Sequence, residues 1–128
     1  MNLLLDTHLL IWAAAARERL SPQALDLILD PSNSLHFSVA SVWEAAIKAP
    51  LGRDRSFPEA SVLRRGLLQN DYVEVPITAP HALAAGALPP LHGDPFDRML
   101  VAQAQMEGMV LLTADTKLAV YGAGVRLV

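Results

Sequence analysis

The sequence predicts an α/β fold, namely a three-layer α/β/α sandwich with a central parallel sheet of four to five strands. Short apolar runs alternate along the chain with longer segments of helical pattern, which is typical of a parallel sheet with helices on both faces. The first of these runs, residues 3–5, is continuously apolar, as expected of a strand that is covered on both faces. The length of 128 residues fits one domain, which we expect to span 1–128.

Local signals set the ends of the predicted elements. Ser21 and Pro22 suit the N-cap and N1 positions of a helix, so a helix is expected to begin there. Pro50 ends the helix that follows the second strand, and the longest helix opens at residues 94–95 and ends at Gly108. Strands are expected at residues 3–5, 35–38, 72–77, 109–112 and 125–127. Helices are expected at residues 7–19, 22–30, 39–49, 57–70, 78–86 and 94–108.

The composition excludes several functional classes. Hydrophobic residues make up 52% of the chain and charged residues 18%, so a sizeable core is available and disorder is not expected. The net charge of −3 excludes a basic protein that coats nucleic acid. The absence of cysteine excludes disulfide scaffolds, thiolate zinc sites, iron–sulfur clusters and cysteine nucleophiles.

The chain is expected to be a soluble, cytoplasmic protein that associates with itself. Its first residues have no basic segment and include an acid after three leucines, which is atypical of a signal peptide. The longest apolar stretches fall short of the roughly 18 residues that a membrane helix needs, so no membrane association is expected. The charged fraction is below the ~25% typical of globular domains, which indicates apolar surface buried in a homodimer.

Four acidic residues are placed at the expected carboxyl edge of the sheet. Asp6 ends the first strand and Asp115 follows the fourth. Glu44 and Asp97 lie in the first turns of two helices. Strand ends and the starts of the following helices meet along one edge, where parallel-sheet folds bind ligands. Helix capping is the alternative for each acid except Asp6, and Glu44 would act in a capping box that starts at Ser41.

Four carboxylates at one partly buried edge need a counter-charge. Like charges about 5 Å apart repel by ~3 kcal/mol per pair at an effective dielectric near 20. A fold accepts this repulsion when a cation is bound between the acids. Oxygen ligands without cysteine favour Mg²⁺ or Mn²⁺, as one or two ions.

Four segments of the chain carry a resemblance to a known family. They are LLDTH at residues 4–8, SVWEAAIK at 41–48, HGDPFDR at 92–98 and LTAD at 112–115. They resemble the successive motifs of PIN-domain ribonucleases and, more narrowly, of the VapC-type toxins of bacterial and archaeal toxin–antitoxin modules. The resemblance extends from the first strand to the last, and HGDPFDR is its most specific part. It implies a divalent-metal-dependent endoribonuclease that hydrolyses RNA phosphodiester bonds and has a cognate antitoxin protein as its partner.

The resemblance also implies which residues form the site. The acids that it places in the catalytic, metal-binding group are Asp6, Glu44, Asp97 and Asp115. Thr7 and Thr113 flank two of these acids and are expected to orient them, with capping as the alternative. Asp94 matches the motif as well, and its expected role is to cap a helix beside the site.

A basic segment is the candidate contact for RNA phosphates. This segment, residues 48–65, contains five basic and two acidic residues in a chain that is acidic as a whole. The basic residues are Lys48, Arg53, Arg55, Arg64 and Arg65. The alternative is a solvated helix surface, on which Lys48 pairs with Glu44 four residues earlier.

Two other functional classes stay open at this point. A phosphoacceptor module or phosphatase has similar layers and an acidic pocket, but a phosphatase of this kind needs a second acid where His8 stands, two residues after Asp6. A binding module with a PIN-like fold and no catalysis is the other class, and the four acids argue against it. The four histidines lack the short spacings of zinc sites. Two of them, His8 and His92, are close enough to the expected edge to be candidates for substrate contact.

Overall fold

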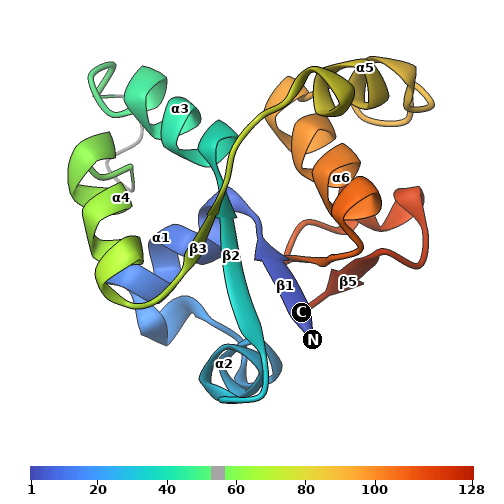
Figure 1. Ribbon diagram of the computed structural model, residues 1–128. Helices are drawn as coiled ribbons and strands as arrows, with labels where there is room; N and C mark the ends of the chain where they lie inside the picture. Colours follow the sequence, from blue (N-terminus) through green and yellow to red (C-terminus); the bar gives the residue numbers. More distant parts are fainter. Residues whose placement is uncertain (53–56) are drawn as a thin grey trace.

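The computed structural model describes residues 1–52 and 57–128, and a five-stranded parallel sheet lies at its centre (Figure 1). The strands are β1 (Asn2–Leu5), β2 (Ser34–Ser38), β3 (Val73–Val75), β4 (Val110–Thr113) and β5 (Val125–Leu127). Their order across the sheet is β3-β2-β1-β4-β5, and all neighbouring pairs are parallel. The predicted α/β fold with a parallel sheet is confirmed.

Helices connect the strands and cover both faces of the sheet (Figure 1). The α-helices of the described residues are α1 (Thr7–Ala15), α2 (Pro22–Leu29), α3 (Val39–Lys48), α4 (Ala60–Gln69), α5 (Ala79–Ala87) and α6 (Pro95–Glu107). Two short 3₁₀ helices are η1 (Arg17–Arg19) and η2 (Thr116–Tyr121). None of the described helices has the length and apolar character needed to cross a membrane.

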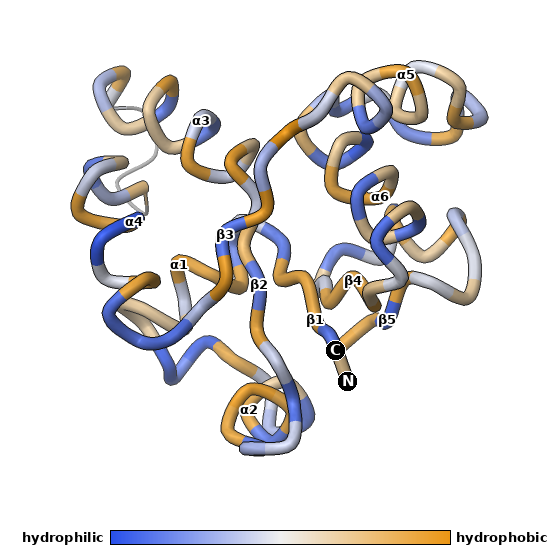
Figure 2. The backbone as a smooth tube through the Cα atoms, viewed as in Figure 1, coloured by the Kyte–Doolittle hydropathy of each residue, from blue (hydrophilic) through white to orange (hydrophobic). Residues whose placement is uncertain are grey.

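Alternate residues of β1 enter two separate hydrophobic cores. Leu3 and Leu5 pack with residues of α1, α2 and α4 on one face of the sheet, and Leu4 packs with α6 and η2 on the other. All three leucines are fully buried, and Figure 2 shows β1 as hydrophobic over most of its length. Helix α3 contributes Ala45 to the first core and Ala40 to the second, so it lies across the carboxyl edge of the sheet. The acid that follows β1 is therefore anchored to the central, doubly covered strand.

The boundaries of two helices differ from the predicted ones. The helix predicted at 7–19 ends at Ala15, because Ala16 leaves the helical conformation (φ −152°, ψ 58°) and η1 then turns the chain so that Leu20 is buried. The helix predicted at 57–70 begins at Ala60. Phe57 instead packs its side chain into the first core before the helix starts.

The capping predictions are correct for some helices and wrong for one. Ser21 and Asp94 accept hydrogen bonds from backbone N–H groups of the helices that they precede, and Gly108 ends α6 with a left-handed φ of 65°. The capping box at Ser41 is wrong, because α3 begins earlier, with Ser38 as its N-cap. Glu44 is therefore inside the helix, beyond the reach of a capping role, and its burial needs another explanation.

Candidate functional site

The four predicted acids lie at the carboxyl edge of the sheet. Asp6 connects β1 to α1, and Asp115 follows β4 and precedes η2. Because β1 and β4 pair directly, these two acids are brought to neighbouring positions. Asp97 lies in the first turn of α6, which packs on the face formed by both strands, and Glu44 lies within α3, which crosses the same edge.

Asp6 has both carboxylate oxygens fixed by neighbours. Its Oδ1 accepts a hydrogen bond from the Leu9 N–H at 2.9 Å, and its Oδ2 accepts one from the Thr113 hydroxyl. Asp6 is therefore the N-cap of α1, and the inference that its position excludes capping is wrong. The direct turn from β1 into α1 leaves unpaired N–H groups that a carboxylate at this position satisfies. Burial raises the pKa of Asp6, against the lowering effect of these two hydrogen bonds.

Asp97, Asp115 and His92 form a compact group. One potential ligand atom from each of these residues lies within 4.8 Å of the other two. The His92 Nε2 atom is 2.9 Å from Asp97 Oδ2. Asp94 accepts hydrogen bonds from the N–H groups of Phe96 and Asp97, so it fixes the first turn of α6 from which Asp97 projects. Three segments of the chain thus converge on one small volume.

The environment of Asp97 disfavours its negative charge. Burial raises its pKa to about 6, against the lowering effect of the hydrogen bond to His92. The nearby charges of Asp94 and Asp6 contribute to the rise. A carboxylate that is destabilised by burial and by neighbouring negative charges is stabilised more by a bound cation than a solvated carboxylate is.

Glu44 is 4% exposed, and its two carboxylate oxygens have different surroundings. The Lys48 Nζ atom lies 2.5 Å from Oε2, whereas Oε1 is buried and has no hydrogen-bond partner among the described residues. The ammonium group of Lys48 also lies over the rings of Phe57 and Phe96, 5.2 and 5.9 Å from their centroids. Partial burial acts to lower the pKa of Lys48, but the hydrogen bond and charge of Glu44 outweigh it and raise that pKa.

These residues fit a hard divalent cation. The carboxylates of Asp6, Asp97 and Asp115 are close enough for their charges to interact. The unpartnered oxygen of Glu44 is a second and independent indication, because buried acceptors are normally paired with a donor, a water molecule or an ion. A set of carboxylate oxygens with one neighbouring imidazole suits Mg²⁺ or Mn²⁺.

Other predicted site residues lie in different surroundings. The Thr7 hydroxyl donates to the Ser41 hydroxyl at 2.9 Å rather than to an acid. Arg64 forms an ion pair with Glu74 at 2.6 Å, and Arg65 is exposed on α4. The predicted RNA contacts at residues 53 and 55, Arg53 and Arg55, lie outside the described residues. Of the described basic candidates, Lys48 is the one placed at the acidic edge.

Arg98 has a role that the sequence analysis missed. Its guanidinium donates to backbone carbonyls of the segment that precedes α6, those of Ala85, Leu88, Pro89 and His92. The segment between α5 and α6 has few hydrogen bonds of its own, so this side chain holds it in place. The available signal was the run of two prolines in a loop next to an arginine in the first turns of a helix, since such a loop leaves its carbonyls without partners.

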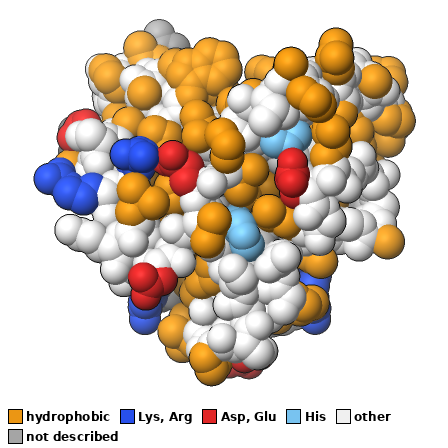
Figure 3. Space-filling model, in the orientation of Figure 1, with side chains coloured by type: hydrophobic (Ala, Val, Ile, Leu, Met, Phe, Trp, Pro, Cys, Tyr) orange, Lys and Arg blue, Asp and Glu red, His pale blue; other side chains and the backbone are white. Residues whose placement is uncertain are grey.

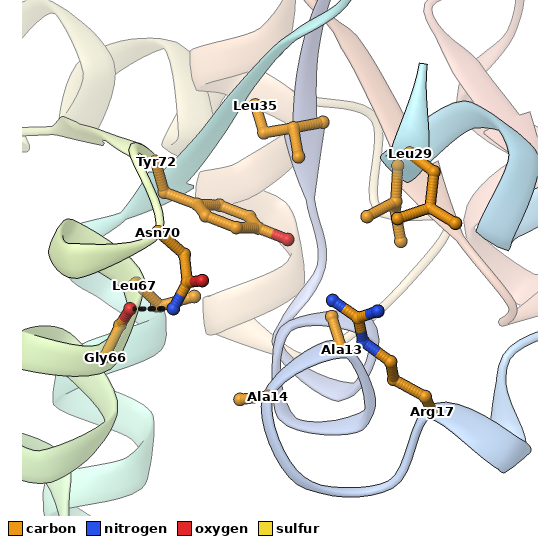
Figure 4. A pocket seen from close by; sticks show the side chains of 10 residues that line it. Ala13, Ala14, Arg17, Leu29, Leu35, Gly66, Leu67, Asn70 and Tyr72 are labelled. Atoms are coloured by element: carbon orange, nitrogen blue, oxygen red, sulfur yellow. Dashed lines mark hydrogen bonds between the residues drawn. The ribbon is translucent and has the colours of Figure 1, made fainter. Parts of the chain in front are cut away.

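Two further surfaces, a pocket of mixed lining and an apolar patch, lie outside the acidic edge. A pocket between α1, α2 and α4 is lined mainly by apolar side chains, with Arg17, Asn70 and Tyr72 among its polar members (Figure 4). Hydrophobic side chains also gather over α3 and α5, at the top of the view in Figure 3. Trp43 on α3 is 58% exposed, and Leu83 on α5 is 76% exposed. Surfaces of this kind are typical of sites where another chain binds.

Comparison with known proteins relates the chain to one family and one fold. A family model described as PIN domain matches residues 3–124. The structure of VapBC2 from Rickettsia felis bound to a DNA fragment from its promoter aligns with a TM-score of 0.70 and 15% identity, covering 99% of this chain and 97% of that one. A toxin–antitoxin complex from Klebsiella pneumoniae aligns with a TM-score of 0.67 and 24% identity, covering 96% and 94%. VapBC-1 from nontypeable Haemophilus influenzae aligns with a TM-score of 0.61 and 21% identity, covering 94% of this chain and 92% of that one. No curated protein matches the sequence.

Proposed function

Since the chain belongs to the PIN domain family, we propose that it is a divalent-metal-dependent endoribonuclease that hydrolyses RNA phosphodiester bonds and acts as the toxin of a toxin–antitoxin pair. The observation that carries the proposal is the compact group of His92, Asp97 and Asp115, with the charge of Asp6 close enough to act on Asp97 and Asp115. The buried, unpartnered oxygen of Glu44 on the same edge supports it. Acids that repel one another at a partly buried edge are stable together when a cation is bound. An acidic edge without a cation would also repel the phosphates of RNA.

Each residue has a distinct part in the proposed reaction. Asp6, Asp97 and Asp115 would hold Mg²⁺ or Mn²⁺, with Glu44 Oε1 as a further ligand. A bound divalent ion would lower the pKa of a water molecule toward neutrality and neutralise charge on the phosphoryl oxygens. The Thr113 hydroxyl and the Leu9 N–H fix the carboxylate plane of Asp6, and Asp94 fixes the turn that carries Asp97. His92, hydrogen-bonded to Asp97, would contact the substrate or orient that carboxylate.

RNA cleavage is expected in millimolar Mg²⁺ or Mn²⁺ and not in excess EDTA. The measurement is gel analysis of structured and unstructured labelled RNAs after incubation with the purified protein. The matched control is Asp6→Ala protein purified in the same way, because equal cleavage by that variant would indicate a contaminating nuclease. Cleavage that persists unchanged in EDTA contradicts the metal mechanism. Metal binding without cleavage of any RNA would favour a binding module with the same fold.

The proposed antitoxin partner has a candidate surface in the pocket between α1, α2 and α4 (Figure 4). The similar structure from Klebsiella pneumoniae is described as a toxin–antitoxin complex. Leu29, 56% exposed, lies on α2 at this pocket, and Leu35 also lines it. We propose that an antitoxin segment with apolar side chains covers this surface, and that a basic or polar group of the antitoxin reaches the acidic edge.

A homodimer is expected at tens of micromolar, formed through α3 and α5. The side chains of Trp43, Ile77, Ala82 and Phe96 line one apolar hollow between α3, α5 and α6, and Leu83, next to Ala82 in the chain, is exposed on α5. Leu83→Glu adds a charge to this surface at a position that is already exposed, and light scattering is expected to show a shift to monomer. Leu29→Glu adds the same charge on α2, at the other end of the molecule in Figure 1, and is expected to leave the dimer intact. A monomeric parent would contradict the prediction.

A further inference from the structure

The side chain of Lys48 is built into the acidic edge from three directions. Its ammonium forms an ion pair with Glu44, which lies one helical turn earlier and is almost fully buried. The rings of Phe57, just before α4, and Phe96, in the first turn of α6, lie beneath the same ammonium. A helix, a segment before another helix and the HGDPFDR motif therefore meet around one positive charge.

This arrangement differs from an ordinary pair on a helix surface. In such a pair both partners are solvated, and the pair contributes little to the stability of the fold. Here one partner is 5% exposed at the side chain, and the ammonium contacts aromatic rings that favour a cation over a neutral group. The charge of Lys48 also acts on Asp94 and Asp97, which lie in or before α6. Lys48 therefore offsets part of the negative charge of Asp94 and Asp97 as well as that of its helical neighbour Glu44.

We propose that the Lys48 ammonium is a built-in cation that takes the place of a second divalent ion, so that the site binds one metal ion per chain. The inference rests on the proposed function, because it assigns a number of ions to the same site. Glu44 Oε2 is occupied by Lys48, which leaves Oε1 and the carboxylates of the compact group for a single ion. Two divalent ions beside a fixed ammonium would place five positive charges among four acids.

The number of Mn²⁺ ions bound tests the proposal without any cleavage assay. Titration calorimetry and Mn²⁺ electron paramagnetic resonance on the full chain, in the absence of RNA, are expected to give one ion per chain for the parent. Lys48→Met removes the charge and keeps an unbranched apolar side chain over the two rings, so a second ion is expected to bind. Lys48→Arg keeps the charge and is expected to bind one ion. Lys117→Met removes the same charge at an exposed position near Asp115 and is also expected to bind one.

The outcomes separate this proposal from the proposed function. If the parent and Lys48→Met each bind one ion, the proposed role of Lys48 is overturned. Two ions bound to the parent also overturn it, and this result does not depend on whether a variant folds. In both cases metal-dependent cleavage by the parent would leave the proposed function intact. No Mn²⁺ bound to the parent overturns both. If Lys48→Met is folded without metal but too unstable for calorimetry, thermal melts give the same answer: a rise in melting temperature on addition of Mn²⁺ that is larger than that of the parent supports the proposal, and an equal rise contradicts it.

Discussion

Asp6→Asn is expected to reduce metal-dependent RNA cleavage by roughly 100-fold or more. Loss of a residue that only supports a metal ligand typically costs 10- to 100-fold, so loss of a charged ligand on the central strand should reach at least the upper end of that range. The measurement is the initial rate of cleavage of a labelled RNA in Mn²⁺. The affinity for Mn²⁺, measured by calorimetry, is expected to fall with it.

The substituted protein is expected to stay folded. Asparagine is as good an N-cap as aspartate, so its Oδ1 can still accept from the Leu9 N–H, and a buried negative charge is removed. Asp26→Asn is the matched control, because it makes the same change on the exposed surface of α2, beyond the amino ends of the strands in Figure 1. Its cleavage rate is expected to equal that of the parent. Full activity of Asp6→Asn would remove Asp6 from the catalytic group.

Asp97→Asn is expected to stabilise the metal-free protein and to weaken its stabilisation by metal. The rise in the pKa of Asp97 from 3.8 to about 6 means that the charged form is disfavoured in the folded state by on the order of 1–3 kcal/mol. Asparagine removes that cost, so thermal melts in EDTA near pH 7.5 are expected to show a rise of roughly 3–10 °C. Mn²⁺ should raise the melting temperature of the parent by mass action and that of the variant much less.

The effect of pH on this difference has a definite sign. A carboxyl group whose pKa is raised by folding binds its proton more tightly in the folded state, so the metal-free parent loses stability as the pH rises from about 4 to about 6. The advantage of Asp97→Asn is therefore complete above pH 6 and absent near pH 4. If Asp97 only interacts with the dipole of α6, the variant should instead lose about 0.3–1 kcal/mol in EDTA and in Mn²⁺ alike. Melts of both proteins in both buffers decide between these results.

Patterns that depend on neighbouring positions in the chain predicted much of this fold. The continuous apolar run at 3–5 predicted a strand covered on both faces, and Ser21 and Asp94 predicted helix starts. The placement of acids at strand ends and helix starts predicted that Asp97 and Asp115 would meet, because a parallel sheet brings those positions to one edge.

Features that depend on distant contacts were beyond the sequence. The capping role of Asp6 is the exception, because the Leu9 N–H from which it accepts is three residues away and an aspartate before a helix is a local capping signal. The rings beside Lys48 come from segments before α4 and α6, and only the packed structure brings them together. The burial of Phe57 in the first core shortened the predicted helix for the same reason, since a core position overrides a local helical pattern.

The hydrogen bond between Thr113 and Asp6 joins residues that are 107 positions apart. Contacts of such separation form late, because the intervening chain must lose its freedom before they can be made. On a ribosome, β1 emerges first and stays without its β4 neighbour until more than a hundred further residues have been synthesised. The acidic edge therefore cannot assemble before β4 has been synthesised, and the proposed nuclease site stays incomplete until that point.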